Sequence, residues 1–280
     1  MKTGVIDVGG GLRDIYAVGV FDYFMDKGIK LDYCLGISAG SANCASYLAG
    51  QRGRNLKFYT EYAMRPEYMG MRHLVREKSY IDFNYVYGVL SNSDGESPLD
   101  YEAIRRNPAE LVVEAENAET GLPVYFTKDD IWQDHYNIFM ASSCVPGIDR
   151  PQIIDGVPYF DGALGDPIPL QRAFDDGCDR IVLILSRPKD VPRPVGKDEY
   201  ISRAIRRRYP RSAEEMLHRA AKYNRRLEEA KCLERDGRVL IIAPDDTCGI
   251  STLTRDRIRL KSLYSRGYRD AAAIHRWFPE

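Results

Sequence analysis

The sequence predicts an α/β fold built around a central, mostly parallel β-sheet. Within residues 1–50, short apolar segments alternate with segments of helical periodicity, and later buried strands are indicated at Ile181–Leu185 and Arg238–Ala243. Such alternation implies parallel strands joined by right-handed crossovers. The chain has 280 residues, of which 44% are hydrophobic, and this is enough for one large domain with insertions. We therefore expect residues 1–280 to form a single domain.

The first unit has the order strand, glycine turn, helix, strand, helix. Gly4–Val8 is a short apolar strand, and three glycines interrupt it before apolar residues recur at helical spacing from Ile15 onward. Gly28 ends that helix, because glycine is common just beyond a helix C-terminus. A second strand is expected at Tyr33–Ile37, and the small residues of Ser41–Leu48 are compatible with a second helix.

The rest of the chain is less regular. Residues 54–98 are rich in tyrosine and basic residues without clear periodicity, and we expect them to form part of a cover over the substrate. Leu111–Ala115 and Val124–Phe126 flank a glycine-containing turn, which predicts a β-hairpin. Arginine and glutamate dominate at about 197–236, a pattern typical of exposed helices in an insertion or lobe. An amphipathic C-terminal helix is predicted at about 254–276.

The composition argues against several classes of protein. The 40 basic and 41 acidic residues leave a formal net charge of −1, which gives no electrostatic reason to expect a nucleic-acid partner. The six cysteines form no closely spaced pair or metal cluster, a pattern of reduced thiols. No secretory segment follows Met1, and the aliphatic runs are too short to cross a bilayer. We expect a soluble, cytoplasmic protein whose contact with membranes is at most peripheral.

A serine between glycines is the first candidate for chemistry. Gly36-Ile37-Ser38-Ala39-Gly40 follows a predicted strand and precedes a predicted helix, as a nucleophile elbow does. The N–H of Ala39 and the helix N-terminus would then lie beside an oxyanion formed when Ser38 attacks a carbonyl. The alternative is a glycine-rich turn that merely allows close packing.

A second donor for an oxyanion is expected in the glycine turn. Gly9, Gly10 and Gly11 supply N–H groups at the end of the neighbouring strand, and Arg13 would order that loop or add positive charge.

The same turn has a competing interpretation as a dinucleotide phosphate cradle, because its first and third glycines match the first two of that motif. However, Asp14 stands where the third glycine is required, and Asp32 precedes the second strand instead of following it. Nucleotide binding is therefore the weaker interpretation.

A serine nucleophile needs a base, and none of the four histidines (His73, His135, His218, His275) follows a late strand as the α/β-hydrolase order requires. An aspartate held against the serine can take this role. Asp161 ends an apolar run and is followed by Gly162, which lets the chain turn there. Taken alone, Asp-Gly is most often a plain β-turn.

Three ordered motifs are more specific than any one of them. Over roughly the first 185 residues, the chain resembles the patatin-like phospholipase family. The motifs that carry the resemblance are Asp7–Arg13, Gly36–Gly40 and Asp161–Ala163, and Ala141–Gly147 precedes the last of them. The resemblance implies a three-layer sandwich and a lipid acyl hydrolase that acts through a Ser-Asp dyad, without catalytic histidine, cofactor or metal.

The resemblance also implies roles for individual residues. Ser38 would be the nucleophile, Asp161 the proton acceptor, and the loop of Gly9 to Gly11 with Arg13 the oxyanion element. Asp14 departs from the family, which commonly has glycine there, and we expect it to act as the N-cap of the following helix.

The substrate is expected to be a lipid or another acyl ester. Six side chains could line an apolar cleft, although core or rim positions are the alternative: Tyr59, Tyr62, Met64, Tyr68, Met69 and Met71. Arg203–Arg211 could contact anionic head groups, but a solvated helix face is the simpler interpretation. A non-catalytic lipid-binding or regulatory module that retains the fold is the alternative function.

Overall fold

An eight-stranded sheet forms the centre of the computed structural model, which describes residues 1–196 and 198–279. The strands lie in the order β5-β6-β3-β2-β1-β7-β8, and β4 pairs with β3 outside that path. Pairing is parallel from β3 through β2, β1 and β7 to β8, whereas β4, β5 and β6 pair in antiparallel fashion. The strands are β1 (Thr3–Asp7), β2 (Tyr33–Ile37), β3 (Glu110–Asn117), β4 (Pro123–Thr127), β5 (Gln152–Ile154), β6 (Val157–Asp161), β7 (Arg180–Ile184) and β8 (Val239–Ile242).

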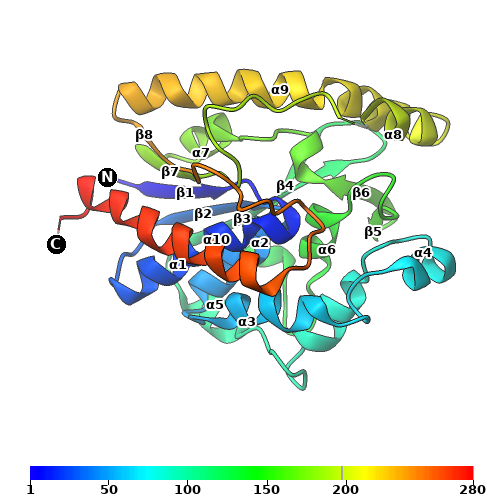
Figure 1. The fold of residues 1–280 in the computed structure, drawn as a ribbon, viewed down its shortest axis with the longest axis horizontal. Helices are drawn as coiled ribbons and strands as arrows, with labels where there is room; N and C mark the ends of the chain where they lie inside the picture. Colours follow the sequence, from blue (N-terminus) through cyan, green and yellow to red (C-terminus); the bar gives the residue numbers. More distant parts are fainter. Residues whose placement is uncertain (197, 280) are drawn as a thin grey trace.

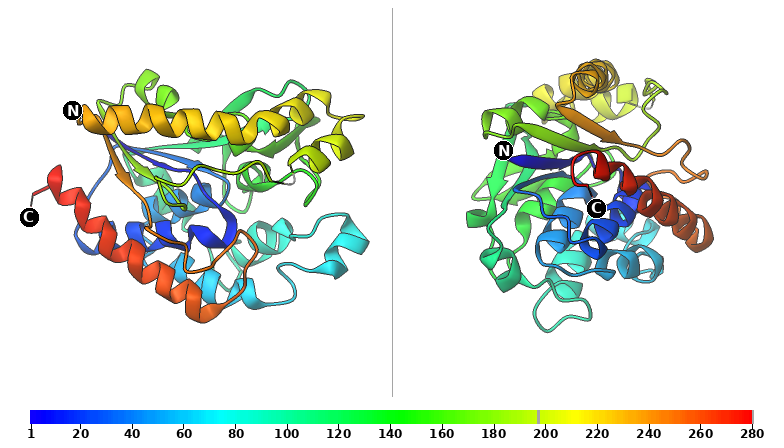
Figure 2. Two further views of the ribbon diagram at one scale, coloured as in Figure 1. Left: turned by 45° about the horizontal axis from the view of Figure 1, so that its top comes forward. Right: turned by 90° about the vertical axis from the view of Figure 1, so that its left-hand side faces the viewer.

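Helices cover both faces of this sheet, which gives the three layers visible in Figure 1 and in the end view of Figure 2. Val5 and Val182 point to the face covered by α1, α2 and α10. Their neighbours Ile6 and Leu183 point to the opposite face, where α7 and α9 pack. The helices are α1 (Ile15–Asp26), α2 (Ala39–Leu48), α3 (Arg54–Thr60), α4 (Met71–Glu77), α5 (Tyr101–Arg106), α6 (Asn137–Ser143), α7 (Leu170–Asp175), α8 (Asp198–Ile205), α9 (Pro210–Arg235) and α10 (Arg257–Asp270). The predicted α/β sandwich with a mostly parallel sheet is confirmed.

The predicted elements of the first fifty residues occur where the sequence places them. A 3₁₀ turn at Gly11–Asp14 leads directly into α1, and Gly28 follows the end of that helix with a φ of 64°. The hairpin of β3 and β4 is also present, with antiparallel pairing from Val112 to Glu116.

The pairing along β3 determines where the ends of two other strands lie. Ile37 at the end of β2 lies opposite Glu114, and Asp161 at the end of β6 lies opposite the next residue, Ala115. Because β4 pairs with the overlapping range Val112–Glu116, it occupies the other edge of β3. β2 and β6 therefore share one edge, and their carboxyl ends meet there.

Residues 54–98 form several short elements of different type. Besides α3 and α4 they include a 3₁₀ turn at Tyr62–Met64 and a π-helical turn at Tyr85–Leu90. In Figure 1 this part of the chain lies on the side of the sheet opposite α9.

The arginine- and glutamate-rich segment is helical, but α9 is not a solvated lobe. Its buried side chains include Met216, Tyr223 and Leu227, and the last two join the core of the sheet face that α9 covers. Its remaining surface is charged and carries ion pairs such as Arg211 with Glu214 at 3.6 Å. Lys197, the first residue of the predicted segment, lies outside the described residues. The segment therefore forms one wall of the sandwich.

The predicted C-terminal helix corresponds to α10 and a following 3₁₀ segment, Ala271–Arg276. α10 crosses α1 very closely, since a Cβ on Gly267 would lie 2.0 Å from the carbonyl oxygen of Tyr16. Among the described residues, no helix has both the length and the apolar composition needed to cross a membrane.

Candidate active site

Ser38 occupies a strained turn between β2 and α2. Its φ of 55° and ψ of −130° are unusual for a residue with a side chain. The Ser38 N–H donates to Ser142 Oγ at 2.7 Å, and Ser41 Oγ donates to the Ser38 carbonyl at 2.6 Å. The turn is thus held from two sides, and its strand-turn-helix context is that of a nucleophile elbow.

The glycines that flank Ser38 are required by close approach of the backbone. A Cβ on Gly36 would lie 2.4 Å from the Cα of Ser41, and one on Gly40 would lie 2.4 Å from the carbonyl oxygen of Asp7. These glycines let α2 start directly against β1 and β2. Close packing was the alternative explanation of the motif, and it is present together with the strained serine.

Asp161 reaches the same place from β6. Asp161 pairs with Ala115 of β3, and Ile37, the residue before Ser38, pairs with the adjacent Glu114. Asp161 Oδ1 accepts a hydrogen bond from the Ala163 N–H at 2.9 Å. Gly162 is needed here as well, because a Cβ would lie 2.4 Å from the carbonyl oxygen of Glu114.

The carboxyl group of Asp161 is buried, and burial raises its pKa above the ordinary aspartate value. The positive charge of Arg219 opposes this most strongly, followed by hydrogen bonds from the Ala163 N–H and the Ser38 side chain and by the charge of Arg193. A desolvated carboxylate with a raised pKa that is hydrogen-bonded to a serine can accept that serine's proton.

The glycine loop lies beside Ser38. Gly9, Gly10 and Gly11 have φ values of 68°, 147° and 59°, all in the region that favours glycine. The Gly9 N–H donates to Asp7 Oδ1 at 3.1 Å, and Ser186 Oγ donates to the Gly9 carbonyl at 2.6 Å. The N–H groups of Gly10 and Gly11 donate to no acceptor among the described residues. They are available to a ligand.

The expectation that Asp14 caps α1 is wrong. Asp14 stands at the N-cap position, but its side chain makes no capping hydrogen bond. The 3₁₀ turn that precedes α1 already supplies acceptors, since the Ile15 N–H bonds to the Leu12 carbonyl. Asp14 is instead fully buried, and Asn43 Nδ2 donates to its Oδ2 at 2.9 Å and to Asp7 Oδ2 at 3.1 Å.

Asp7 and Asp14 therefore form a buried acidic pair beneath the glycine loop. Burial raises the pKa of Asp7 to about 6. Burial, together with the neighbouring Asp7, raises the pKa of Asp14 well above its ordinary value. Burial therefore disfavours the ionised form of both carboxyl groups, and Asp7 Oδ1 is the acceptor that fixes the Gly9 N–H.

A cavity of about 260 Å³ brings the predicted residues together. Its lining includes Ser38, Asp161, Ala39, Arg13 and the three loop glycines, whereas Gly36, Gly40 and Gly162 act behind it through the backbone. Apolar walls come from residues 54–98, including Phe58, Tyr59, Tyr68, Val86, Tyr87 and Leu90. The expected cover over the site is therefore present in this segment.

The six tyrosine and methionine candidates for the cleft divide into two groups. Tyr59 and Tyr68 line the cavity. Tyr62 and Met69 are buried in the core, Met64 packs against it, and Met71 is exposed.

Several residues of the site have no role assigned from the sequence. Ser142 and Ser186 hold the backbone of Ser38 and Gly9. Arg187, Arg193 and Arg219 line the cavity although they lie far from the three motifs. Ser186 follows β7, the neighbour of β1, so the rule that sites form at the carboxyl ends of parallel strands could have found it. In the described part of the chain, no group of three or more His, Cys, Asp or Glu side chains could hold a metal ion.

Known structures and proteins resemble this chain over most of its length. The crystal structure of VipD from Legionella pneumophila matches with a TM-score of 0.50 and 13% identity, over 97% of this chain and 66% of that one, and this likeness concerns the fold alone. The uncharacterized protein YjjU of Escherichia coli (strain K12) is 29% identical over 197 residues. That match covers 68% of this chain and 53% of YjjU, so it spans about half the length of this relative.

Two family models match separate parts of the sequence. A domain of unknown function (DUF6363) matches residues 209–276, which include α9, β8 and α10. The model of the patatin-like phospholipase family matches residues 8–174, more than half of the chain, and this range contains Ser38, Asp161 and the glycine loop. This chain therefore belongs to the patatin-like phospholipase family.

Proposed function

We propose that this protein is a serine acyl hydrolase that cleaves carboxylic ester bonds of lipids. The observation that carries the proposal is the meeting of Ser38 and Asp161 at one point on the edge of β3, within a cavity that also exposes the glycine loop. Nucleophile, base and oxyanion donors are the parts that ester hydrolysis through an acyl-enzyme needs.

In the first half-reaction, Ser38 Oγ attacks the ester carbonyl and Asp161 takes the serine proton. The carbonyl oxygen becomes an oxyanion, which accepts hydrogen bonds from the N–H groups of Gly10 and Gly11 and lies near Ala39 at the N-terminus of α2. Asp161 then passes the proton to the leaving alcohol. Removing one such oxyanion donor costs roughly 10²–10³ in rate in other hydrolases.

In the second half-reaction, Asp161 removes a proton from water, which attacks the carbonyl of the acyl-serine. The bond to Ser38 Oγ then breaks, Asp161 returns the proton to that oxygen, and the fatty acid is released. Asp161 is suited to both steps because Arg219 and Arg193 favour its ionised form against the effect of burial. No histidine is needed: none of the four lies among the residues that line the cavity.

The acyl chain would lie against the apolar walls that α3 and the π-helical turn contribute. Phe58, Tyr59 and Tyr87 are aromatic side chains of these walls, and Val86 and Leu90 extend them. Apolar pockets with a few convergent polar groups are typical of small-molecule sites.

Turnover of p-nitrophenyl butyrate by the full chain tests the proposal. We expect Ser38→Ala to abolish hydrolysis and Asp161→Asn to reduce it by about 10³-fold or more, since nucleophile and base act as a unit. The matched controls are Ser265→Ala and Asp94→Asn, because both residues are exposed and lie outside the cavity lining. Binding of the ester without turnover by the wild type would favour the non-catalytic lipid-binding alternative.

A further inference from the structure

One wall of the cavity carries four arginine side chains, which we call the arginine wall: Arg13, Arg187, Arg193 and Arg219. Arg13 follows the glycine loop, Arg187 and Arg193 lie in the segment after β7, and Arg219 lies on α9. Asp161 is the acidic residue that shares this lining. The wall therefore concentrates positive charge beside the candidate nucleophile.

These arginines have little to bind within the protein. None of the four takes part in an ion pair among the described residues. Arg13 Nε donates to Ser186 Oγ at a long 3.4 Å. The Nε of Arg219 is buried, and no described residue accepts its hydrogen bond. Arg54 lines the same cavity but differs, because it donates to Ser46, Asn55, Ser91 and the carbonyls of Ser97 and Pro98. Arg54 therefore has a structural role, whereas the guanidinium groups of the arginine wall keep N–H donors without acceptors among the described residues.

The four charges also destabilise one another. Burial, and then Arg187, lowers the pKa of Arg13 to about 10. Burial, and then Arg219 and Arg187, lowers the pKa of Arg193 to about 9. Asp198 near Arg193 and Asp14 near Arg13 oppose these shifts only in part, because both pKa values stay below the ordinary arginine value. An anion bound among the four would relieve this repulsion.

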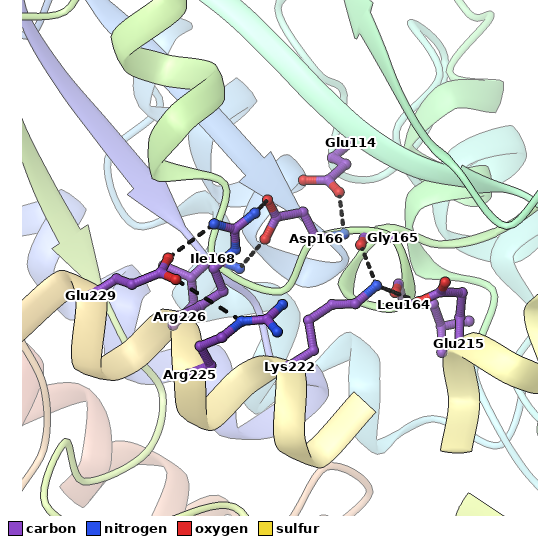
Figure 3. A network of polar contacts seen from close by, with 10 residues as sticks. All are labelled: Glu114, Leu164, Gly165, Asp166, Ile168, Glu215, Lys222, Arg225, Arg226 and Glu229. Atoms are coloured by element: carbon purple, nitrogen blue, oxygen red, sulfur yellow. Dashed lines mark hydrogen bonds and ion pairs between the residues drawn. The ribbon is translucent and has the colours of Figure 1, made fainter. Parts of the chain in front are cut away.

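Arg219 lies on a face of α9 that is anchored to the rest of the protein. Lys222, Tyr223 and Arg226 follow Arg219 by three, four and seven positions, so all four lie on the same side of the helix. Figure 3 shows the contacts of Lys222 and Arg226 on this face. Lys222 Nζ donates to the carbonyls of Leu164 and Gly165 at 3.3 and 3.0 Å, just after the candidate base.

The neighbouring contacts complete this anchoring. Arg226 pairs with Asp166 at 2.9 Å, and the Asp166 N–H donates to Glu114 Oε1 at 2.9 Å. Arg193 is held from the same helix, because its N–H donates to Asn224 Oδ1 at 2.7 Å and its carbonyl accepts from Asn224 Nδ2 at 3.1 Å. The backbone that carries Arg193 and the helix that carries Arg219 are therefore anchored before any ligand arrives, so binding does not have to order them.

We propose that the arginine wall binds the phosphate of the substrate, so that the enzyme prefers acyl esters carrying an anionic phosphate over those with a zwitterionic head group. Guanidinium groups bind phosphate oxygens through paired, charge-assisted hydrogen bonds. The acyl chain would lie against the apolar residues that positions 54–98 contribute to the cavity. Figure 1 shows this segment and α9, which carries Arg219, on opposite sides of the sheet. A choline cation beside four arginines is repelled, and this repulsion supplies the discrimination.

This inference rests on the proposed function, because it assigns the substrate class of the same site. Three of the four arginines in the arginine wall, Arg187, Arg193 and Arg219, lie outside the range matched by the patatin-like phospholipase model. Arg219 lies within the range matched by the domain of unknown function. That second segment would therefore contribute to substrate selection.

Binding to the full-length Ser38→Ala variant separates recognition from turnover. Calorimetry would compare octanoyl lysophosphatidate, octanoyl lysophosphatidylcholine and glycerol phosphate, each with and without Arg187→Gln. Arg187 is the first target because Arg219 and Arg193 also act on the pKa of Asp161. Arg193→Gln is the second variant, and the exposed Arg225→Gln on α9 is the control.

We expect lysophosphatidate to bind about tenfold or more tightly than lysophosphatidylcholine, since one charge-assisted contact is worth roughly that factor. Arg187→Gln should remove most of this preference, and Arg225→Gln should retain it. Equal affinity for the two lipids, or an undiminished preference in both Arg187→Gln and Arg193→Gln, would overturn the proposal. So would glycerol phosphate binding as tightly as lysophosphatidate, because the site would then take a free phosphate ligand.

Wild-type turnover of p-nitrophenyl butyrate tests ester hydrolysis separately from phosphate binding. A head-group preference without turnover would refute hydrolysis and leave the phosphate site standing. Turnover without a head-group preference would refute the phosphate site alone.

Discussion

Asp161 lies one residue further along the edge of β3 than Ile37, the residue before Ser38. The two side chains that a hydrolase needs are thus brought together by the register of one sheet, although 123 positions separate them in the chain. β2 runs parallel to β3 and β6 runs antiparallel to it, so both carboxyl ends arrive at the same point. A slip of one residue in either pairing would move one side chain to the other face of the sheet.

The pH dependence of activity should reveal the partnership of Asp161 and Arg219. Burial raises the pKa of Asp161, and Arg219 is the strongest of the groups that lower it. Because the base must be ionised, activity is lost as the pH falls through this pKa. Replacing Arg219 with glutamine raises the pKa of Asp161 further, so the acidic limb of kcat/KM should move to higher pH.

The measurement is a pH profile of p-nitrophenyl butyrate hydrolysis by wild type and Arg219→Gln, with Arg225→Gln as the control. A limb that stays in place or moves to lower pH in Arg219→Gln would show that Arg219 does not favour the ionised base.

The crossing of α1 and α10 should not tolerate an added methyl group. A Cβ on Gly267 would lie 2.0 Å from the Tyr16 carbonyl oxygen, so Gly267→Ala forces the helices apart. We expect a loss of about 1–3 kcal/mol in the free energy of unfolding, as for other overpacked sites. Gly196→Ala is the control, because no described atom lies within 4 Å of a Cβ there, and it should change stability by less than about 0.5 kcal/mol. Equal melting temperatures for both variants would contradict the close crossing.

Stability should fall as the pH rises toward neutrality, partly because of Glu116. Burial raises the pKa of Glu116 to about 7, its Oε1 accepts from Ser212, and its buried Oε2 finds no partner among the described residues. The folded protein holds this proton more tightly than the unfolded chain does. The contribution is therefore present below the ordinary glutamate pKa of 4.5 and is lost as the pH rises through the folded-state pKa of about 7.

Glu116→Gln removes this titration and should gain about 1–3 kcal/mol relative to wild type between about pH 5 and pH 8. Urea unfolding at the two pH values measures the difference. The exposed Glu119→Gln on the same hairpin serves as the control. A difference that stays constant with pH would mean that Glu116 is already ionised in the folded protein.

Much of the fold could be predicted because local signals agreed. Gly28 and the glycine loop delimit α1, and the apolar segment Tyr33–Ile37 is a strand over its whole length. The glycines around Ser38 identified it as a candidate in the same way, since its neighbours must be small where α2 approaches β1. Residues 54–98 gave no such pattern, because their short helices, 3₁₀ turn and π-helical turn share no common periodicity.

One available signal in α9 was overlooked. Its buried residues recur at alternating spacings of four and three, which indicates a narrow apolar stripe: Met216, Ala220, Tyr223, Leu227 and Ala230. The surrounding arginines and glutamates concealed this stripe in the composition. The helix was therefore expected in an exposed lobe, whereas it covers one face of the sheet.

The arginine wall could not have been predicted by local rules. Arg13 belongs to a motif, but Arg187, Arg193 and Arg219 meet it only through the packing of the β7 segment and α9. The prediction that Asp14 caps α1 was wrong for the same reason, because the side chain of Asp14 accepts a hydrogen bond from Asn43 on the next helix. Capping is a local rule, and here a long-range hydrogen bond overrode it.

Mass spectrometry of the protein after reaction with a fluorophosphonate is the decisive test of the Ser38–Asp161 dyad. We expect one covalent adduct on Ser38 in the wild type, none in Ser38→Ala, and much slower formation in Asp161→Asn, where the base is lost while the fold is kept. An adduct on another residue, or labelling of folded Asp161→Asn at the wild-type rate, would contradict the dyad.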